Sequence, residues 1–275
     1  MFTLNCKGRL LIVDKPLVMG IINATPDSFF GGSRFNEVDE IVAKVEKMLS
    51  DGADIIDIGG QSTRPGSDLI SPDDEIKRVV PAIKAITKKF PDTFISIDTF
   101  YSPVAIAAVN SGATIVNDIS AGSMDNKMIE TVAQLKVPYI LMHMKGTPQT
   151  MQQNAVYENV NREVLDFFIA KTSELKKAGI IDIIIDPGFG FGKTIDHNFE
   201  LLKDLSVFRM LDKPILVGIS RKSTVYKTLG VTADEALNGT SVLNTIALMN
   251  GASVLRVHDV KEAKEAVTLF MATNK

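Results

Sequence analysis

Polar side chains that could bind or activate a substrate stand at the ends of successive apolar runs. In chain order they are Asn23, Asp57, Asp98, Asn117, Asp118, His143, Asp186, Ser220, Arg256 and His258. Carboxylates and amides can hydrogen-bond a polar ring, and a guanidinium or an imidazole can bind an anion. If the runs are parallel strands, their carboxyl ends meet at one rim, where the catalytic groups of a closed barrel sit. The pattern therefore predicts one candidate site.

The apolar runs number eight and alternate with helical patterns. The predicted strands cover 18–23, 54–59, 94–98, 114–117, 139–143, 182–186, 214–218 and 253–257. The predicted helices cover 38–49, 72–89, 102–112, 125–135, 160–178, 233–249 and 260–271. Such alternation is typical of a parallel sheet covered by helices. We therefore predict an α/β fold, a TIM (β/α)8 barrel, rather than an open doubly wound sheet, which usually has fewer than eight strands.

A β-hairpin is predicted ahead of the first barrel strand. Residues 2–4 and 9–13 are apolar and flank a turn at 5–8 that ends in Gly8. We expect this N-terminal hairpin to cap the bottom of the barrel. The chain has 275 residues and 45% hydrophobic content, and barrels of this kind commonly use about 250 residues. A single domain, 1–275, is therefore predicted.

Composition narrows the range of partners and compartments. A formal net charge of −3 provides no global positive field, so neither nucleic acid nor an anionic membrane surface is an expected partner. No apolar run reaches the roughly 18 residues that a membrane-spanning helix needs. Cys6 is the single cysteine, and the first residues lack the pattern of a secretory signal. We expect a cytoplasmic protein.

The glycine-rich segment 187–193 has some features of a nucleotide-binding loop. A phosphate-binding P-loop would need glycine where Pro187 stands, and the dinucleotide fingerprint would need glycine where Lys193 stands. Both motifs are therefore rejected.

Five motifs at the predicted rim carry a family resemblance. They are NATPDSF at 23–29, GGQSTRPG at 59–66, DPGFGFGK at 186–193, SRKS at 220–223 and RVHDV at 256–260. In this order they resemble the dihydropteroate synthase family over the whole chain. The resemblance implies condensation of hydroxymethyl-dihydropterin pyrophosphate with para-aminobenzoate, which yields dihydropteroate and pyrophosphate in folate biosynthesis. It also implies a homodimer.

The resemblance implies that four catalytic residues, Asp98, Asp186, Lys222 and Arg256, bind the pterin together with Asn117. The chemistry of these side chains agrees with that role. Asp98 and Asp186, with Asn117, would bind the aminopyrimidinone edge; Lys222 would contact the ring carbonyl or a ring nitrogen; and the Arg256 guanidinium would stack on the ring face. A pterin edge presents donors and acceptors that short carboxylates and amides satisfy.

The second substrate and the leaving group need other residues. Asn23, Arg64, Arg256 and His258 suit a pyrophosphate, and the resemblance implies that the Asn23 amide helps hold Mg²⁺ carried by that group. Candidates around para-aminobenzoate are Thr63, Pro65, Phe191, Lys222 and Ser223. We interpret His143 and His197 as structural.

Our mechanistic hypothesis is that the bond to pyrophosphate breaks before the amine attacks, with Asp98 and Asp186 stabilising the cation. Two alternative functions stay open at this point. One is a methyl-tetrahydrofolate-binding barrel of a corrinoid methyltransferase, which the STRPG and SRKS motifs disfavour. The other is a catalytically silent pterin-binding paralogue. For the dimer, the last two helices offer apolar residues such as Leu243, Ile246, Ala247, Leu248 and Met249, which could equally pack on the barrel.

Overall fold

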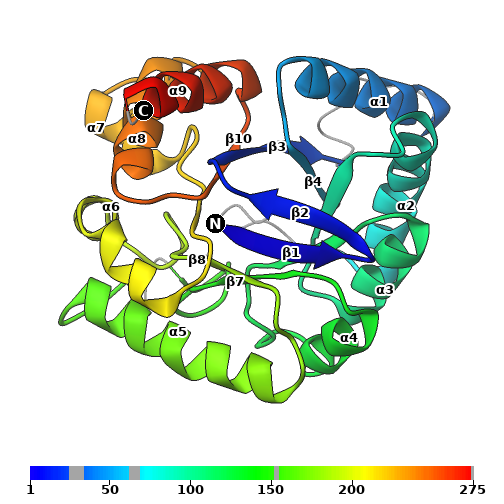
Figure 1. Ribbon diagram of the computed structural model, residues 1–275, viewed down its shortest axis with the longest axis horizontal. Helices are drawn as coiled ribbons and strands as arrows, with labels where there is room; N and C mark the ends of the chain where they lie inside the picture. Colours follow the sequence, from blue (N-terminus) through cyan, green and yellow to red (C-terminus); the bar gives the residue numbers. More distant parts are fainter. Residues whose placement is uncertain (25–33, 62–68, 152–154, 274–275) are drawn as a thin grey trace.

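The chain folds as an eight-stranded parallel barrel surrounded by helices (Figure 1). The computed structural model describes residues 1–24, 34–61, 69–151 and 155–273. The strand order is β8-β7-β6-β5-β4-β3-β10-β9. A parallel bridge between Ile185 and Ile215 joins the β8 end of this order to the segment that enters β9. The predicted TIM barrel is therefore confirmed.

The elements alternate along the chain. The barrel strands are β3 (Leu17–Asn23), β4 (Ile55–Gly59), β5 (Phe94–Asp98), β6 (Ile115–Asp118), β7 (Tyr139–Met142), β8 (Ile183–Asp186), β9 (Leu216–Val217) and β10 (Val254–Val257). The helices are α1 (Arg34–Ser50), α2 (Pro72–Lys89), α3 (Ser102–Ser111), α4 (Met128–Leu135), α5 (Val160–Lys177), α6 (Ile195–Lys203), η2 (Leu205–Leu211), α7 (Ser223–Leu229), α8 (Leu237–Met249) and α9 (Val260–Thr273).

The strand sequences are aliphatic because the strands are covered on both faces. All residues of β4, β6, β7 and β8 are buried. Helix starts are marked by local chemistry: the Ser71 hydroxyl accepts a hydrogen bond from the Asp74 amide at 3.1 Å, and Pro72 opens α2. No described helix is long and apolar enough to cross a membrane.

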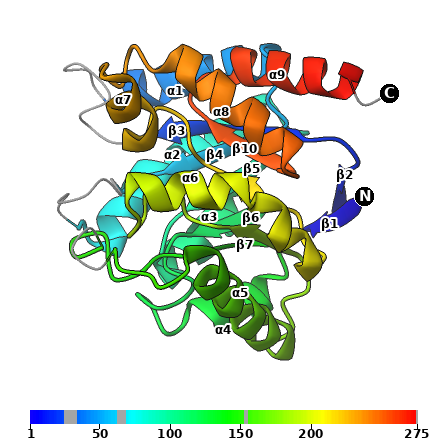
Figure 2. The same ribbon diagram turned by 90° about the vertical axis from the view of Figure 1, so that its left-hand side faces the viewer.

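The N-terminal hairpin closes one end of the barrel (Figure 2). Its strands β1 (Phe2–Cys6) and β2 (Arg9–Val13) pair antiparallel, as predicted. Leu4, Cys6, Leu11 and Val13 pack in one apolar cluster with the inward residues of the barrel strands. The Arg9 guanidinium donates to the carbonyls of Pro91 and Thr93, just ahead of β5. The hairpin thus caps the amino ends of the strands, and the rim at their carboxyl ends stays available.

The structure corrects the predictions near the last strands. β9 has two residues where we predicted five, because much of this segment's pairing runs through the isolated bridge and through backbone bonds around Ile215. Three short helices, α6, η2 and α7, were not predicted. Helix α8 begins at Leu237, later than predicted, since the carbonyls of Ala233 and Asp234 accept hydrogen bonds from Arg221.

Candidate active site

Arg256 joins side chains from four strands at the rim. Its Nε donates to Asp57 Oδ2 at 2.7 Å, and its Nη2 donates to Asp98 Oδ2 at 2.6 Å. Asn117 Nδ2 donates to the same Asp57 oxygen at 3.1 Å. These bonds lie along the edge of the guanidinium, so its flat faces remain able to stack. Two predicted pterin residues and the predicted stacking residue are therefore held in one network.

Burial sets the electrostatics of this network. Asp98 is 9% exposed, and burial raises the pKa of its carboxyl to about 7, although Arg256 pulls it down. Burial also raises the pKa of Asp186, against the lowering effect of Lys222. For Arg256, Asp57 and Asp98 outweigh the opposing effect of burial, so its pKa is raised and the group stays charged. Carboxylates from β4, β5 and β8 thus share the rim with the Arg256 cation from β10.

Lys222, on the loop after β9, contacts the loop after β8 at the same rim. Lys222 Nζ donates to the Phe189 carbonyl at 2.6 Å and lies 4.6 Å from the centre of the Phe191 ring. Desolvation lowers the pKa of Lys222 to about 8, while Asp186 and Asp98 oppose the shift. Gly218 lies beside both cations, since a Cβ there would make ordinary contacts of 3.8 Å with Arg256 Cβ and 3.9 Å with Lys222 Nζ.

His258 lies exposed at the end of β10, beside Ser220. Ser220 Oγ lies 3.1 Å from His258 Nδ1 and accepts a hydrogen bond from the His258 amide. Partial desolvation and the charge of Arg256 lower the pKa of His258 to about 4. A neutral imidazole can still donate one hydrogen bond to an anion.

Two further predicted site residues lie at the ends of elements. Ser223 begins α7, directly after Lys222, and Asn23 is the exposed last residue of β3. Thr63, Arg64 and Pro65 lie outside the described residues.

Two residues with structural importance received no role from the sequence. Asp57 appeared among the strand ends, but only the structure shows it holding Arg256 and Asn117 together. Lys193, the last residue of the DPGFGFGK motif, received no role of its own and is buried with its amine beside His143. The motif singled out the segment, but no local signal in the sequence assigns a contact to Lys193 or to Asp57.

His143 and His197, which we interpreted as structural, make contacts that suit a structural role. His143 is buried, and burial lowers its pKa to about 2. The His197 ring accepts a hydrogen bond from the Thr194 amide, completing a capping box at the start of α6.

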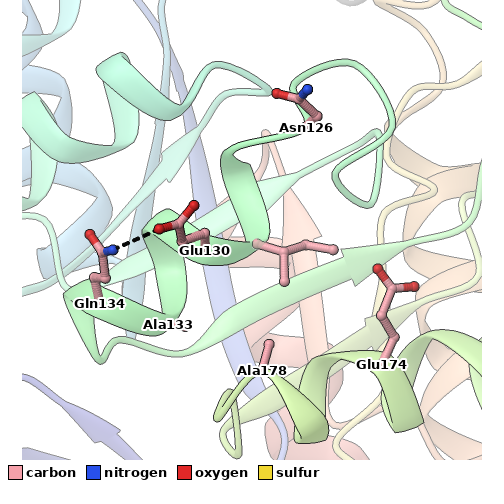
Figure 3. Close-up of a pocket in the computed structure, with 7 residues that line it drawn as sticks. Asn126, Glu130, Ala133, Gln134, Glu174 and Ala178 are labelled. Atoms are coloured by element: carbon pink, nitrogen blue, oxygen red, sulfur yellow. Dashed lines mark hydrogen bonds between the residues drawn. The ribbon is translucent and has the colours of Figure 1, made fainter.

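A groove on the barrel wall is separate from the rim (Figure 3). It lies between α4 and the C-terminal part of α5 and is lined by Asn126, Ile129, Glu130, Ala133, Gln134, Glu174 and Ala178. It contains none of the predicted site residues.

Known proteins that are similar to this chain are pterin-binding enzymes. A sequence model of the pterin binding enzyme family matches residues 19–258. Dihydropteroate synthase from Haemophilus influenzae is 42% identical over 272 residues, with 98% of each chain covered. A crystal structure of the Yersinia pestis dihydropteroate synthase in a sulfonamide drug complex has a TM-score of 0.93 at 40% identity, and 99% of each chain is covered.

A further solved relative is the Xanthomonas albilineans dihydropteroate synthase with 4-aminobenzoic acid. Its TM-score is 0.92 at 37% identity, and the match covers 99% of this chain and 98% of the other. Matches of this extent in both sequence and structure show that the chain belongs to the dihydropteroate synthase family of pterin binding enzymes.

Proposed function

We propose that this chain condenses hydroxymethyl-dihydropterin pyrophosphate with para-aminobenzoate to give dihydropteroate and pyrophosphate. The observation that carries the proposal is the rim network in which Arg256 joins Asp57 and Asp98 and Asn117 joins Asp57. It combines the donors and acceptors that a pterin edge requires with a guanidinium that can cover the ring. The near full-length relatives support the same activity.

In this proposal Asp98, Asn117 and Asp186 bind the pterin edge. All three are buried at the ends of β5, β6 and β8. The β5–β6 register sets Asp98 directly beside Asn117. Lys222, on the loop after β9, would bind the pterin together with these residues. Burial lowers the pKa of its amine, and the charge of Asp186 acts on the amine against that effect.

The pyrophosphate would lie toward Asn23, Arg64, Arg256 and His258. Within the described residues no group of three His, Cys, Asp or Glu side chains could hold a metal ion alone. A single amide oxygen from Asn23 suits Mg²⁺ only as one ligand among phosphate oxygens and water. The residues therefore fit a metal that arrives with the substrate, and when bound it would neutralise charge on the leaving group.

For the reaction, we propose that the carbon–oxygen bond breaks with its electron pair leaving on pyrophosphate. The methylene carbon then carries a cation delocalised over the dihydropterin. Carboxylates of Asp98 and Asp186 stabilise it; one opposite charge near 4 Å at an effective dielectric of 20 contributes about 4 kcal/mol, or roughly a thousandfold in rate. The aminobenzoate nitrogen attacks, forms the carbon–nitrogen bond and loses a proton.

The aminobenzoate would be positioned by Phe191, Lys222 and Ser223, with Thr63 and Pro65. Phe191 and Lys222 already contact each other at the rim. An aromatic amine needs orientation more than activation, because its nitrogen is nucleophilic without a base. Ordered binding follows, in which the pterin substrate completes the aminobenzoate pocket.

Two further proposals concern the setting of the enzyme. A cytoplasmic location agrees with a buried, free Cys6 thiol, whose pKa burial raises to about 12. A homodimer through α7, α8 and α9 agrees with the apolar side chains that these helices expose, including Val242 and Met249.

The test is pyrophosphate release from the pterin substrate with Mg²⁺, measured with and without para-aminobenzoate. We expect release to depend on aminobenzoate and to fall by about a hundredfold or more in Asp186→Asn, since the substitution removes one stabilising charge. Asp182→Asn, just ahead of the amino end of the same strand, is the matched control. Pterin binding without release would favour the silent paralogue, and methyl transfer from methyl-tetrahydrofolate would favour the corrinoid reading.

A further inference from the structure

A buried lysine lies beneath the loop that carries Phe191. Lys193 is 3% exposed, and its amine lies within hydrogen-bond distance of the carbonyls of Gly188 at 3.0 Å, Phe191 at 3.1 Å and His143 at 3.3 Å. The fourth neighbour is His143 Nδ1 at 2.9 Å. Four acceptors thus surround one amine inside the protein.

The charge states of the pair follow from this geometry. The three carbonyls can only accept from the amine, and a protonated amine also donates to an unprotonated His143 Nδ1. Burial lowers the pKa of His143 to about 2, which keeps the ring neutral, and edge-on packing against Phe167 at 4.9 Å shields it from water. Burial also lowers the pKa of Lys193, to about 7, although Asp186 opposes the shift.

Two lysines bind three carbonyls of the same loop. The Gly188 and Phe191 carbonyls accept from Lys193, and the intervening Phe189 carbonyl accepts from Lys222 in the site. The loop carbonyls therefore contact one amine in the interior and one at the rim. The interior amine thus contacts the backbone of Phe191, whose ring lies against Lys222.

We propose that Lys193, seated on neutral His143, is a positioning residue that forms the aminobenzoate pocket by fixing the loop at 187–192. It is not a phosphate-binding lysine, since its amine faces the interior. Asp186 depends on it less, because the β7–β8 ladder and the bond from the His143 amide to the Asp186 carbonyl hold that residue in place. Loss of the amine should therefore affect aminobenzoate more than the pterin.

The first test is Lys193→Met, which keeps an unbranched side chain as far as Cε and removes the amine with its donors. We expect the KM for aminobenzoate to rise at least tenfold, while pterin affinity changes less than threefold. Lys203→Met, an exposed lysine on α6, is the matched control. An unchanged KM for aminobenzoate, or equal losses for both substrates, would overturn the proposal.

A second readout does not depend on activity, which matters because the role of Phe191 rests on the proposed function. Amides of Gly188, Gly190 and Phe191 are hydrogen-bonded in the structure. Their hydrogen exchange should accelerate at least tenfold in Lys193→Met and stay unchanged in Lys203→Met. If the wild type lacks synthase activity, the proposed function fails, while the exchange result still decides the role of Lys193 in the loop.

Chemical rescue separates a missing ammonium from general damage. Propylammonium replaces the atoms that Lys193→Ala removes, so it should restore aminobenzoate KM and loop protection. Tetramethylammonium, which has no N–H donor, should not. Equal effects of the two cations, or of neither, would contradict the proposal.

If both Lys193 variants fail to fold, His143 provides the test. His143→Asn retains an acceptor near Nδ1, whereas His143→Leu does not. We expect wild-type loop exchange in the first and accelerated exchange in the second. Identical behaviour of the two variants would overturn the pairing.

Discussion

At the scale of single residues, the site depends on one carboxylate that need not touch the substrate. Asp57 is fully buried, and its Oδ2 accepts from both Arg256 and Asn117. Removing one partner of a buried ion pair leaves the other charge without compensation, which typically costs about 3–5 kcal/mol. Asp57 is therefore a positioning residue for the cation that would cover the pterin.

We predict that Asp57→Asn lowers kcat/KM for the pterin substrate by at least tenfold, about 1.4 kcal/mol or more. The neutral amide no longer balances the guanidinium and cannot hold both partners equally well. Asp54→Asn is the control, because Asp54 precedes the same strand at the opposite end of the barrel and pairs with Lys264 at 3.0 Å. Steady-state kinetics on both variants decide the matter; equal kinetics in the two would argue against this role of Asp57.

The Asp98 carboxyl predicts a pH dependence. Burial raises its pKa to about 7, and the charges of Asp57, Asp118, Lys222 and Arg256 also act on it. Since the proposed mechanism needs the carboxylate, the group is inactive when protonated, and kcat/KM should fall as pH drops below about 7.

The check is a pH profile of kcat/KM for the wild type and for Asp98→Asn. The acidic limb should be absent from the residual activity of the variant. A limb that persists unchanged in Asp98→Asn would assign it to another group, including the titrating pyrophosphate substrate.

At the scale of elements, the loop after β8 depends on a glycine that no other residue can replace. Gly188 has a φ of +72°, and a Cβ there would lie 2.0 Å from the His143 carbonyl oxygen. The close approach is what allows that carbonyl and the Gly188 carbonyl to share the Lys193 amine. The residues that follow β7 and β8 are thus joined through the Lys193 amine.

We predict that Gly188→Ala destabilises the protein by several kcal/mol. The alanine would have to adopt a strained positive φ, and the His143 backbone would have to move away from its Cβ. Gly179→Ala is the matched control: its φ is +91°, but nothing lies within 4 Å of the added Cβ. That variant should lose only about 1–2 kcal/mol. Denaturant unfolding of the two variants measures the difference, and equal losses would show that the contact with His143 is unimportant.

At the scale of the whole molecule, apolar side chains remain exposed on neighbouring helices. Helix α8 packs against both α7 and α9, which lie together in Figure 1. Val242 and Met249 on α8 are 50% and 71% exposed, and Leu229 on α7 and Leu269 on α9 are also exposed. Of the residues predicted for this face, Ala247 and Leu248 are buried against the barrel instead.

We predict that the wild type sediments as a dimer at micromolar concentration and that Met249→Glu shifts it to monomer, because a charge at an apolar interface is desolvated without a partner. Ile169→Glu on α5, also at an exposed apolar position, should leave the dimer intact. A wild type that is entirely monomeric would refute the proposed homodimer.

The sequence by itself determined the barrel and the composition of its rim. Aliphatic runs such as 183–185 must be buried on both faces, and parallel strands bring Asp98, Asn117 and Asp186 to the same end without any knowledge of their contacts. The start of the helix at Pro72 was also predictable, because its capping signal, Ser71 followed by Pro72, is local in the sequence. Helix α7 was missed, because its seven residues show too little periodicity.

Only the tertiary structure decided which charges are paired. Asp57 and Arg256 are 199 residues apart, and Lys193 and His143 are 50 residues apart, so their contacts depend on barrel closure and strand register. The residue type shows that a side chain can carry a charge. Burial and the neighbouring charged groups, which depend on the fold, decide whether its pKa is raised or lowered. For that reason the contacts of Asp57 with Arg256 and Asn117, and of Lys193 with His143, became visible only in the folded protein.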